Sequence, residues 1–401
     1  MLDYSSDMLT PTYAPSPRVS ASRAQRGISL VELMVSITIG LIITAAVAQT
    51  FIANRATYQL DEGLARMQEN ARFAIDFLNR EIRQAGNMGC VRDSTYATSP
   101  PVVDFSNNLN PPGNFNGVPA AITGFEAPGT GTGQTFSAPT YPTSNSITGW
   151  IPALDSTLIP GGALPGTDAI VIRRASTGSI PIGAPVMPGD ISFQLARPDS
   201  GNQFQEGQLV ILTDCESTSL YQITAIDPSR TIITHAAGTT PPPGNACETG
   251  NPNVAGCGPG DQKYTSAEVM SIQTVALYVA LNANRVPALY MSGQELVEGV
   301  ENMQIMYGVN NVADNSMYRG GDPDRYMTAN EVNTAGLWGS VVNVRISLLM
   351  RTSNTTGSVA DTTLDTGTYL LLGNTTINPE PDDNRRRQVF STTIALRNRG
   401  V

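Results

Sequence analysis

Histidine and lysine are almost absent from this sequence of 401 residues, since His235 and Lys263 are the only ones. A zinc hydrolase needs at least two histidines at helical spacing, so that class is excluded. A Ser-His-Asp triad would have to use His235, which follows a threonine-rich segment, and the sequence contains no Gly-x-Ser-x-Gly elbow. We therefore expect that this protein is not an enzyme.

Charged residues are also scarce, at 14% of the chain, and the net charge is −10. Three arginines and two aspartates give residues 1–27 a net charge of +1, which leaves −11 for the remainder. Because phosphate binding needs a basic surface, this acidic body argues against nucleic acid as a partner. The 40% of apolar residues argue against a disordered chain, whereas 37 glycines and 28 prolines indicate long ordered loops.

Only four cysteines are present, and no two of them have the two-residue spacing of zinc or thioredoxin-like sites. Outside the cytosol such an even set predicts two disulfides, for which three pairings exist. A bond between Cys247 and Cys257 would close a short loop rich in Gly, Pro and Asn. It would leave Cys90 to pair with Cys215, and we predict this pairing.

The most informative feature that is present is a run without charge between Glu32 and Arg55. Residues 33–53 would form roughly 32 Å of helix, which matches a hydrocarbon core of about 30 Å. Residues 1–27 precede this helix with three prolines and three arginines, a composition typical of an unstructured cytoplasmic leader. We therefore predict a leader followed by a membrane segment at 28–53.

A carboxylate alone in lipid is costly, by about 2.5 kcal/mol or more near the bilayer centre, so Glu32 needs a partner. A cut after Gly27 would supply one, because the new amine of Ile28 would lie one helical turn from Glu32. The alternative is an ordinary signal peptide cut after Ala48, which would release a soluble secreted binding protein beginning at Gln49. Glu32 argues against it by interrupting the start of the apolar region.

Beyond the membrane segment, residues 54–89 form an amphipathic pattern. Gly86 and Gly89 carry helix-ending signals, so one helix is expected over 28–85. Arg66, Glu69, Arg72, Asp76, Arg80 and Glu81 lie off its apolar stripe. The stripe itself recurs at steps of three and four, at Leu60, Leu64, Met67, Ala71, Ala74, Leu78 and Ile82.

The rest of the chain predicts β-structure in two regions, a loop-rich insert at 90–264 and an antiparallel sheet at 265–401. Residues 91–166 are expected to be mainly loop, and 294–300 a short helix or turn. Arg345 falls within a strand and is expected to face outward or to be paired. Strands are expected at 168–174, 208–213, 220–226, 231–235, 271–280, 288–291, 303–307, 341–350 and 388–396.

No cofactor is expected. Calcium is the one ion with candidate ligands, because Asp314, Asn315, Asp322 and Asp324 offer oxygen atoms within a short segment. The twelve-residue EF-hand spacing is absent, and solvated loop carboxylates explain the same residues. We therefore predict no metal site and no catalytic residue.

The segment from Arg26 through Gly27 and Ile28 to Glu32 resembles the class III signal of type IV prepilins. In that signal Gly precedes the cut and Glu is the fifth mature residue. Ile28 departs from the Phe that usually begins a mature pilin. The chain also resembles the PilW family of minor pilins over the first helix, 167–226 and most of 270–399, but not over the central insert. The segments that carry the resemblance to PilW are residues 68–74, 81–86, 89–90, 295–301, 307–308, 344–349 and 396–399.

The resemblance implies an α+β type IV pilin fold, in which a long N-terminal helix packs on an antiparallel sheet enlarged by a Gly/Pro-rich β insert. It implies cleavage by prepilin peptidase after Gly27, methylation of the Ile28 amine, and a role for Glu32 in assembly. The protein would reside in the inner membrane with its head in the periplasm and then enter an extracellular pilus, at or near the tip. Its partners would be the major pilin, other minor pilins and a PilY-type adhesin.

The nearest alternative within this resemblance is a J-type pseudopilin of a type II secretion system, which shares the signal and a large head. The segments within 270–399 that resemble PilW favour a pilus subunit over a secretion pseudopilin. A K-type pseudopilin generally lacks the fifth-residue Glu that is present here as Glu32.

Overall fold

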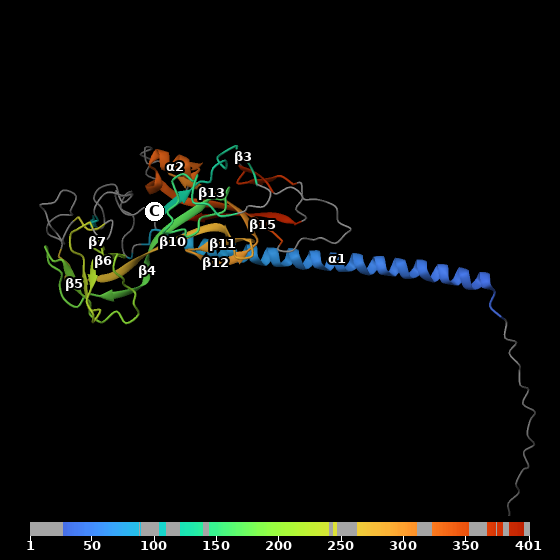
Figure 1. Cartoon of the computed structure of the whole chain (residues 1–401). Helices are drawn as coiled ribbons and strands as arrows, with labels where there is room; N and C mark the ends of the chain where they lie inside the picture. Colours follow the sequence, from blue (N-terminus) through green and yellow to red (C-terminus); the bar gives the residue numbers. More distant parts are fainter. Residues whose placement is uncertain are drawn as a thin grey trace, which may run out of the picture. The chain divides into compact units, whose positions relative to one another are not determined.

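The chain forms two compact units, Met1–Thr57 and Tyr58–Val401, and one helix, α1 (Leu30–Arg83), runs through the boundary between them (Figure 1). The predicted helix over 28–85 is therefore confirmed to within two residues at each end. The computed structural model describes residues 27–87, 89, 104–109, 121–138, 144–239, 244–246, 263–310, 323–352, 367–373, 375–379 and 385–396.

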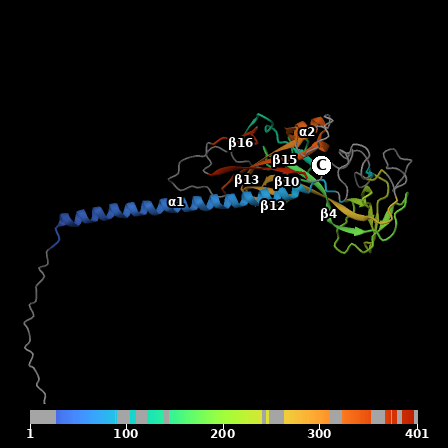
Figure 2. The same ribbon diagram turned by 180° about the vertical axis from the view of Figure 1, so that it is seen from behind.

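The second part of α1 buries the predicted apolar stripe. Leu60 and Leu64 are half-buried, while the five stripe residues from Met67 to Ile82 are at most 3% exposed. The five residues from Met67 to Ile82 share one core cluster with apolar residues of two β-sheets. Figure 2 shows this part of α1 running beside the sheet strands. Two of the five residues, Ala71 and Ala74, are small, which lets strands approach the helix closely.

One residue of this helix differs from the prediction. The sequence pattern places Glu81 on the polar face, but the residue is only 5% exposed. Its carboxylate lies 2.9 Å from Nη2 of Arg174, which belongs to the strand β4 (Ala169–Pro181). A buried carboxylate is tolerated when a cation pairs with it, and helical periodicity contains no information about a partner so distant in the sequence.

The helix ends where the glycine signals predict. Gly86 has a φ of +73°, a conformation that glycine adopts without steric cost. Its N–H donates to the carbonyl of Arg173 at 2.9 Å, and the carbonyl of Asn87 accepts from the N–H of Ala175 at 2.6 Å. The chain after the helix is thereby tied to β4.

The larger sheet has eight strands. Its main order is β1-β7-β6-β10-β11-β12, and β4 pairs with both β10 and β2. All of these pairs are antiparallel except β1 with β7. Besides β4, the strands are β1 (Asp104–Asn107), β2 (Ile122–Phe125), β6 (Leu209–Thr213), β7 (Ser217–Gln222), β10 (Glu268–Leu281), β11 (Pro287–Met291) and β12 (Gln294–Glu298).

The second sheet has the order β14-β13-β15-β18 and is antiparallel throughout. Its strands are β13 (Val300–Val309), β14 (Arg325–Met327), β15 (Val341–Arg351) and β18 (Arg387–Ala395). Two further sheets have three short strands each. One contains β16 (Tyr369–Leu371), β17 (Thr375–Asn378) and β3 (Thr135–Ser137), and the other β5 (Ser192–Gln194), β9 (Ile232–Thr234) and β8 (Ala225–Ile226).

The predicted strands are present, with three differences. The segment predicted as one strand at 220–226 is divided between β7 and β8. The strands expected in one C-terminal sheet belong to two, because β10 and β11 pair within the larger sheet while β13, β15 and β18 form the smaller one. Short strands β1, β2 and β3 also interrupt the region expected to be mainly loop.

The prediction of a helix or turn at 294–300 is wrong. Residues 294–298 form β12, which pairs with β11 in a hairpin. The two loop residues, Ser292 and Gly293, have φ values of +46° and +88°. Such a pair is typical of a type I′ turn, whose twist matches that of the flanking strands.

The helix α2 (Ala329–Ala335) was not predicted, although its start has a sequence signature. Thr328 and Glu331 form a capping box, in which each side chain accepts from the other residue's backbone N–H. Arg345 lies in β15 as predicted, with its guanidinium carbon 3.9 Å from the ring centre of Tyr326.

Asp168 joins the two sheets immediately before β4. Its backbone N–H donates to the carbonyl of Met303 at 2.8 Å, and its Oδ2 accepts from the N–H of Ile305 at 2.9 Å. Its Oδ1 accepts from the N–H of Ala127 at 3.0 Å. Burial raises the pKa of Asp168 to about 8, although these two backbone donors oppose the shift.

A close approach between Gly124 and Tyr307 lies beside this junction. A Cβ atom at Gly124 would collide with the hydroxyl and ring of Tyr307, whose side chain is completely buried. The ring can pass over β2 only because residue 124 has no side chain.

We predict that Gly124→Ala lowers the free energy of unfolding by about 1–3 kcal/mol, because Tyr307 is buried and has no room to move away. The matched control is Gly63→Ala in α1, where the new Cβ would meet Thr352 at an ordinary 3.6 Å. The control should be neutral or stabilising, since Ala favours helix. Chemical unfolding of the two purified variants checks this, and equal stabilities would contradict the prediction.

Candidate functional site

The residues around the predicted cut lie just outside regular structure. Gly27, Ile28 and Ser29 precede the first turn of α1, and Ile28 is 71% exposed. A Cβ at Gly27 would meet no atom within 4 Å. The peptide bond between Gly27 and Ile28 is therefore accessible and is not part of the helix.

Glu32 lies in the first turn of α1. Four backbone N–H groups at a helix start have no partner within the helix, and a carboxylate there is favoured by the helix dipole. Glu32 has no ion-pair partner among the residues that the structure describes. Ile28 precedes it by four positions, a spacing at which side chains on one helix face meet.

The apolar helix that follows satisfies its own hydroxyl groups. Between Glu32 and Arg55 there are four Ser and Thr residues, at positions 36, 38, 44 and 50. Each hydroxyl donates to the backbone carbonyl four residues earlier, at 2.7–2.9 Å. Such bonds let a helix carry hydroxyls through an apolar medium. The helix is long and apolar enough to cross a membrane, and its apolar part is exposed in the described structure.

Of the four cysteines, the structure describes only Cys215, which is disulfide-bonded. It lies in the turn between β6 and β7, where its N–H donates to Oγ1 of Thr213 at 3.2 Å. Cys90, Cys247 and Cys257 lie outside the described residues.

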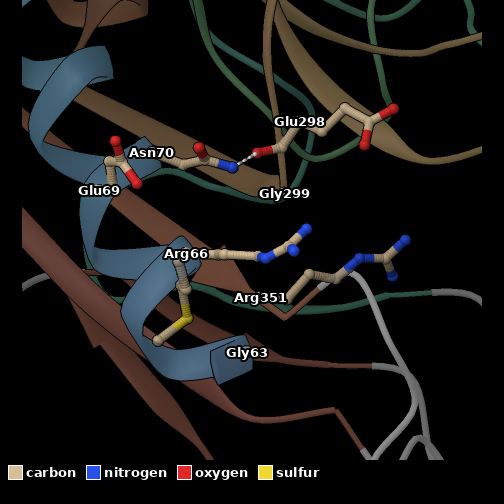
Figure 3. Close-up of a pocket in the computed structure, with 8 residues that line it drawn as sticks. Gly63, Arg66, Glu69, Asn70, Glu298, Gly299 and Arg351 are labelled. Atoms are coloured by element: carbon tan, nitrogen blue, oxygen red, sulfur yellow. Dashed lines mark hydrogen bonds between the residues drawn. The ribbon is translucent and has the colours of Figure 1, made fainter. Parts of the chain in front are cut away.

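A polar pocket of about 330 Å³ lies between α1 and the ends of β12 and β15 (Figure 3). The amide of Asn70 donates to the carbonyl of Glu298 at 3.2 Å on its wall. Two arginines line it, but each has a carboxylate partner: Arg66 lies 2.7 Å from Glu62, and Arg351 lies 3.6 Å from Glu301. The pocket was not predicted, because its two arginines are far apart in the sequence. Its balanced charges indicate no particular ligand.

His235 is completely buried, with its ring centre 4.1 Å from that of Tyr221. Burial lowers its pKa to about 4, so the imidazole is neutral at physiological pH. Of the candidate calcium ligands, Asp314, Asn315 and Asp322 lie outside the described residues. Within the described part of the chain, no three His, Cys, Asp or Glu residues are grouped as metal ligands.

Comparison with known protein families gives one match near the N-terminus of the chain and one in its C-terminal third. Residues 22–48, which include Gly27, Ile28 and Glu32, match the prokaryotic N-terminal methylation motif. Residues 268–398, from β10 through β18, match the family of the type IV pilus-assembly protein W, PilW. No curated protein matches the chain. Together the two matches support a type IV pilus minor pilin that is similar to the PilW family over residues 268–398 and carries a signal of the kind that prepilin peptidase cuts.

Proposed function

We propose that this minor pilin is incorporated at or near the pilus tip, where it primes assembly and supports display of a PilY-type adhesin. A cut after Gly27 leaves 374 residues. That bulk suits a subunit present in few copies, with no neighbour above its globular part, better than one that repeats along a fibre. Its partners are then other minor pilins, the major pilin and the adhesin.

The observation that carries the proposed entry into the pilus is the lone carboxylate of Glu32 beside the accessible bond between Gly27 and Ile28. Cleavage creates an amine at Ile28, and methylation leaves it cationic. In an apolar environment the attraction between this amine and a carboxylate is strong, and either charge left unpaired is costly. The pair, within one chain in the inner membrane or between chains in the filament, would set the register of neighbouring helices. Before assembly, the part beyond α1 would lie in the periplasm.

Two alternatives to a pilus subunit predict different behaviour of the chain. A J-type pseudopilin of a secretion system would share the cut and the carboxylate. A secreted soluble protein would begin at Gln49, but the bond between Ala48 and Gln49 lies inside α1, where no accessible loop is present.

Mass spectrometry of filaments sheared from the cell surface tests the proposal. We expect an N-terminal peptide that begins at Ile28 with a methyl group on its amine. A peptide beginning at Gln49 would exclude the pilus assignment. The Ile28 terminus in the envelope but never in sheared filaments would favour the pseudopilin.

We predict that Glu32→Ala leaves the protein in the membrane but lowers its amount in sheared filaments about tenfold or more, because the Ile28 amine loses its partner. Glu62→Ala is the matched control, since Glu62 is another carboxylate of α1 and only pairs with the exposed Arg66. Quantitative immunoblots of membrane and filament fractions measure both variants. Normal incorporation of Glu32→Ala would refute the pairing role.

We also propose the disulfides Cys90–Cys215 and Cys247–Cys257. Gly89, directly before Cys90, lies beside β6, because a Cβ added to Gly89 would be 3.7 Å from Cγ2 of Thr213. Thr213 in turn accepts the N–H of Cys215. The sequence neighbours of the two cysteines are thus adjacent.

With this pairing, Cys90→Ser should free the thiol of Cys215 and leave Cys247 and Cys257 unreactive. Cys247→Ser should free only Cys257. Alkylation of the unreduced variants followed by peptide mapping identifies the labelled cysteine. A label on Cys247 or Cys257 in the Cys90→Ser variant would mean a different pairing.

A further inference from the structure

The smaller sheet has one face that α1 does not cover. Val344, Ile346 and Leu348 of β15 belong to the core cluster that contains α1. Because successive side chains of a strand point to opposite faces, Arg345 and Ser347 lie on the other face, which we call the outer face. Of the two expectations for Arg345, an outward position or a paired one, the structure shows the outward position.

Part of the outer face is covered by other segments of the chain. Leu349 of β15 packs with Leu371 and Ile377 from the three-stranded sheet of β16, β17 and β3. The amide of Gln304 on β13 donates to the carbonyl of Gly166 at 2.9 Å. These contacts lie toward one end of the sheet, where β13 begins and β15 ends.

Toward β18 the outer face is open. Thr393 lies opposite Arg345 on this strand, and Ser391 lies opposite Ser347. Thr393 and Ser391 are exposed, and the hydroxyl of Ser391 is 2.8 Å from that of the buried Ser347. No large apolar side chain of the four strands of this sheet is exposed in the described structure. The open strip therefore presents hydroxyl groups and a guanidinium.

The guanidinium of Arg345 is held by stacking on an aromatic ring. Its carbon lies 3.9 Å from the ring centre of Tyr326 on β14. Such stacking uses the flat face of the guanidinium and leaves its five N–H donors, which lie in the plane, for other partners. No hydrogen bond or ion pair joins Arg345 to a described residue. The cation is thus fixed in place while its donors have no acceptor in the described structure.

The other covered arginines of this sheet are in a different situation. Arg351 and Arg387 are each 9% exposed, and both pair with Glu301. A cation that is withdrawn from water normally needs such a partner. Arg345 is half-buried and has none among the described residues, which points to a partner outside the chain.

A second polar side chain beside Arg345 is also unsatisfied. Asn343 precedes Arg345 by two positions on the same face and is 6% exposed, and its Oδ1 has no hydrogen-bond partner in the described structure. This oxygen lies over Gly308, since a Cβ added there would collide with it. Gly308 also pairs with Tyr326, so the oxygen and the guanidinium lie over the same part of the sheet. A buried polar atom without a partner is uncommon in a folded protein, and here it adjoins an unpaired cation.

The spacing of the accessible groups favours an extended ligand. Tyr326 and Thr393 belong to strands on opposite sides of β15. The guanidinium reaches from β15 toward Tyr326, so it is separated from the hydroxyls of β18 by roughly two strand spacings, about 10 Å. A chain of two or three sugar rings spans that distance, whereas a single small anion does not.

We propose that Arg345, Thr393 and Ser391 form a binding site for an acidic oligosaccharide. The planar fork of a guanidinium matches the two oxygens of a uronate carboxylate. The hydroxyls of Thr393 and Ser391 both donate and accept hydrogen bonds, as those of a sugar do. A protein partner would instead need apolar groups at the centre of its contact, which the strip lacks. The site does not depend on where the protein lies in the pilus.

The test uses the full chain purified in detergent micelles and isothermal titration calorimetry. The probe is the trimer of galacturonic acid, which we expect to bind with a Kd in the millimolar range. The neutral trimer of galactose should not bind at the same concentration, because it has no carboxylate for Arg345. Acetate offers the carboxylate without the sugar hydroxyls and should bind about tenfold more weakly or less.

Arg345→Gln should weaken binding of the uronate trimer about tenfold or more, because the charge and the fork are both lost. Arg325→Gln is the matched control, since it removes the same charge from an exposed arginine of β14, and it should bind as the original does. Thr393→Val, which loses only a hydroxyl, should weaken binding about threefold. Arg345→Lys, which keeps the charge without the planar fork, replaces Arg345→Gln if circular dichroism shows that the latter does not fold.

Equal binding by the Arg345 and Arg325 variants, or no binding by the original chain, would overturn the proposal. So would acetate that binds as tightly as the uronate trimer, since the hydroxyls would then contribute nothing. Tighter binding of inorganic phosphate would assign the guanidinium to a phosphate group instead. Displacement of the trimer by a lower concentration of an aspartate-rich peptide would assign the site to a protein partner.

Discussion

The contact on which the globular unit depends is the packing of one face of α1 against strands of both large sheets. The side chains from Met67 to Ile82 join a single cluster with residues of β4, β10, β13 and β15. An isolated amphipathic helix gains little stability from its own hydrogen bonds, so its stability comes from this burial. Each sheet in turn needs a cover for one apolar face, and the same helix provides it for both.

Because one helix packs against both large sheets, the two sheets must be held at a fixed distance from each other. Buried polar contacts provide this constraint. Asp168 bonds to Met303 and Ile305 of β13 from the start of β4, and Glu81 pairs with Arg174 from the end of the helix. These buried groups each meet defined partners, which apolar packing alone would not specify. Stability therefore comes from the apolar cluster, and the arrangement of the sheets from a few buried polar contacts.

The parts of this structure that sequence predicts are those with a local physical cause. The period of the stripe and the glycines after it predict α1, and β-branched or alternating apolar residues predict β4, β10 and β15. The residues that mark the cut, Gly27 and Glu32, are likewise contiguous and could be found by inspection. The β11–β12 hairpin was also predictable in principle, since Ser292 and Gly293 occupy a two-residue turn between alternating segments.

What sequence could not provide are pairings between distant segments: the burial of Glu81 against Arg174 and the division of the strands into two sheets. Glu32 is the opposite case, because the sequence marks it and no described residue forms an ion pair with it. In a protein that acted alone this carboxylate would be a liability, since an unpaired charge in an apolar helix is costly. Under the proposed role in assembly it would instead be a directional contact, which selects a register and an orientation where apolar surfaces would allow many.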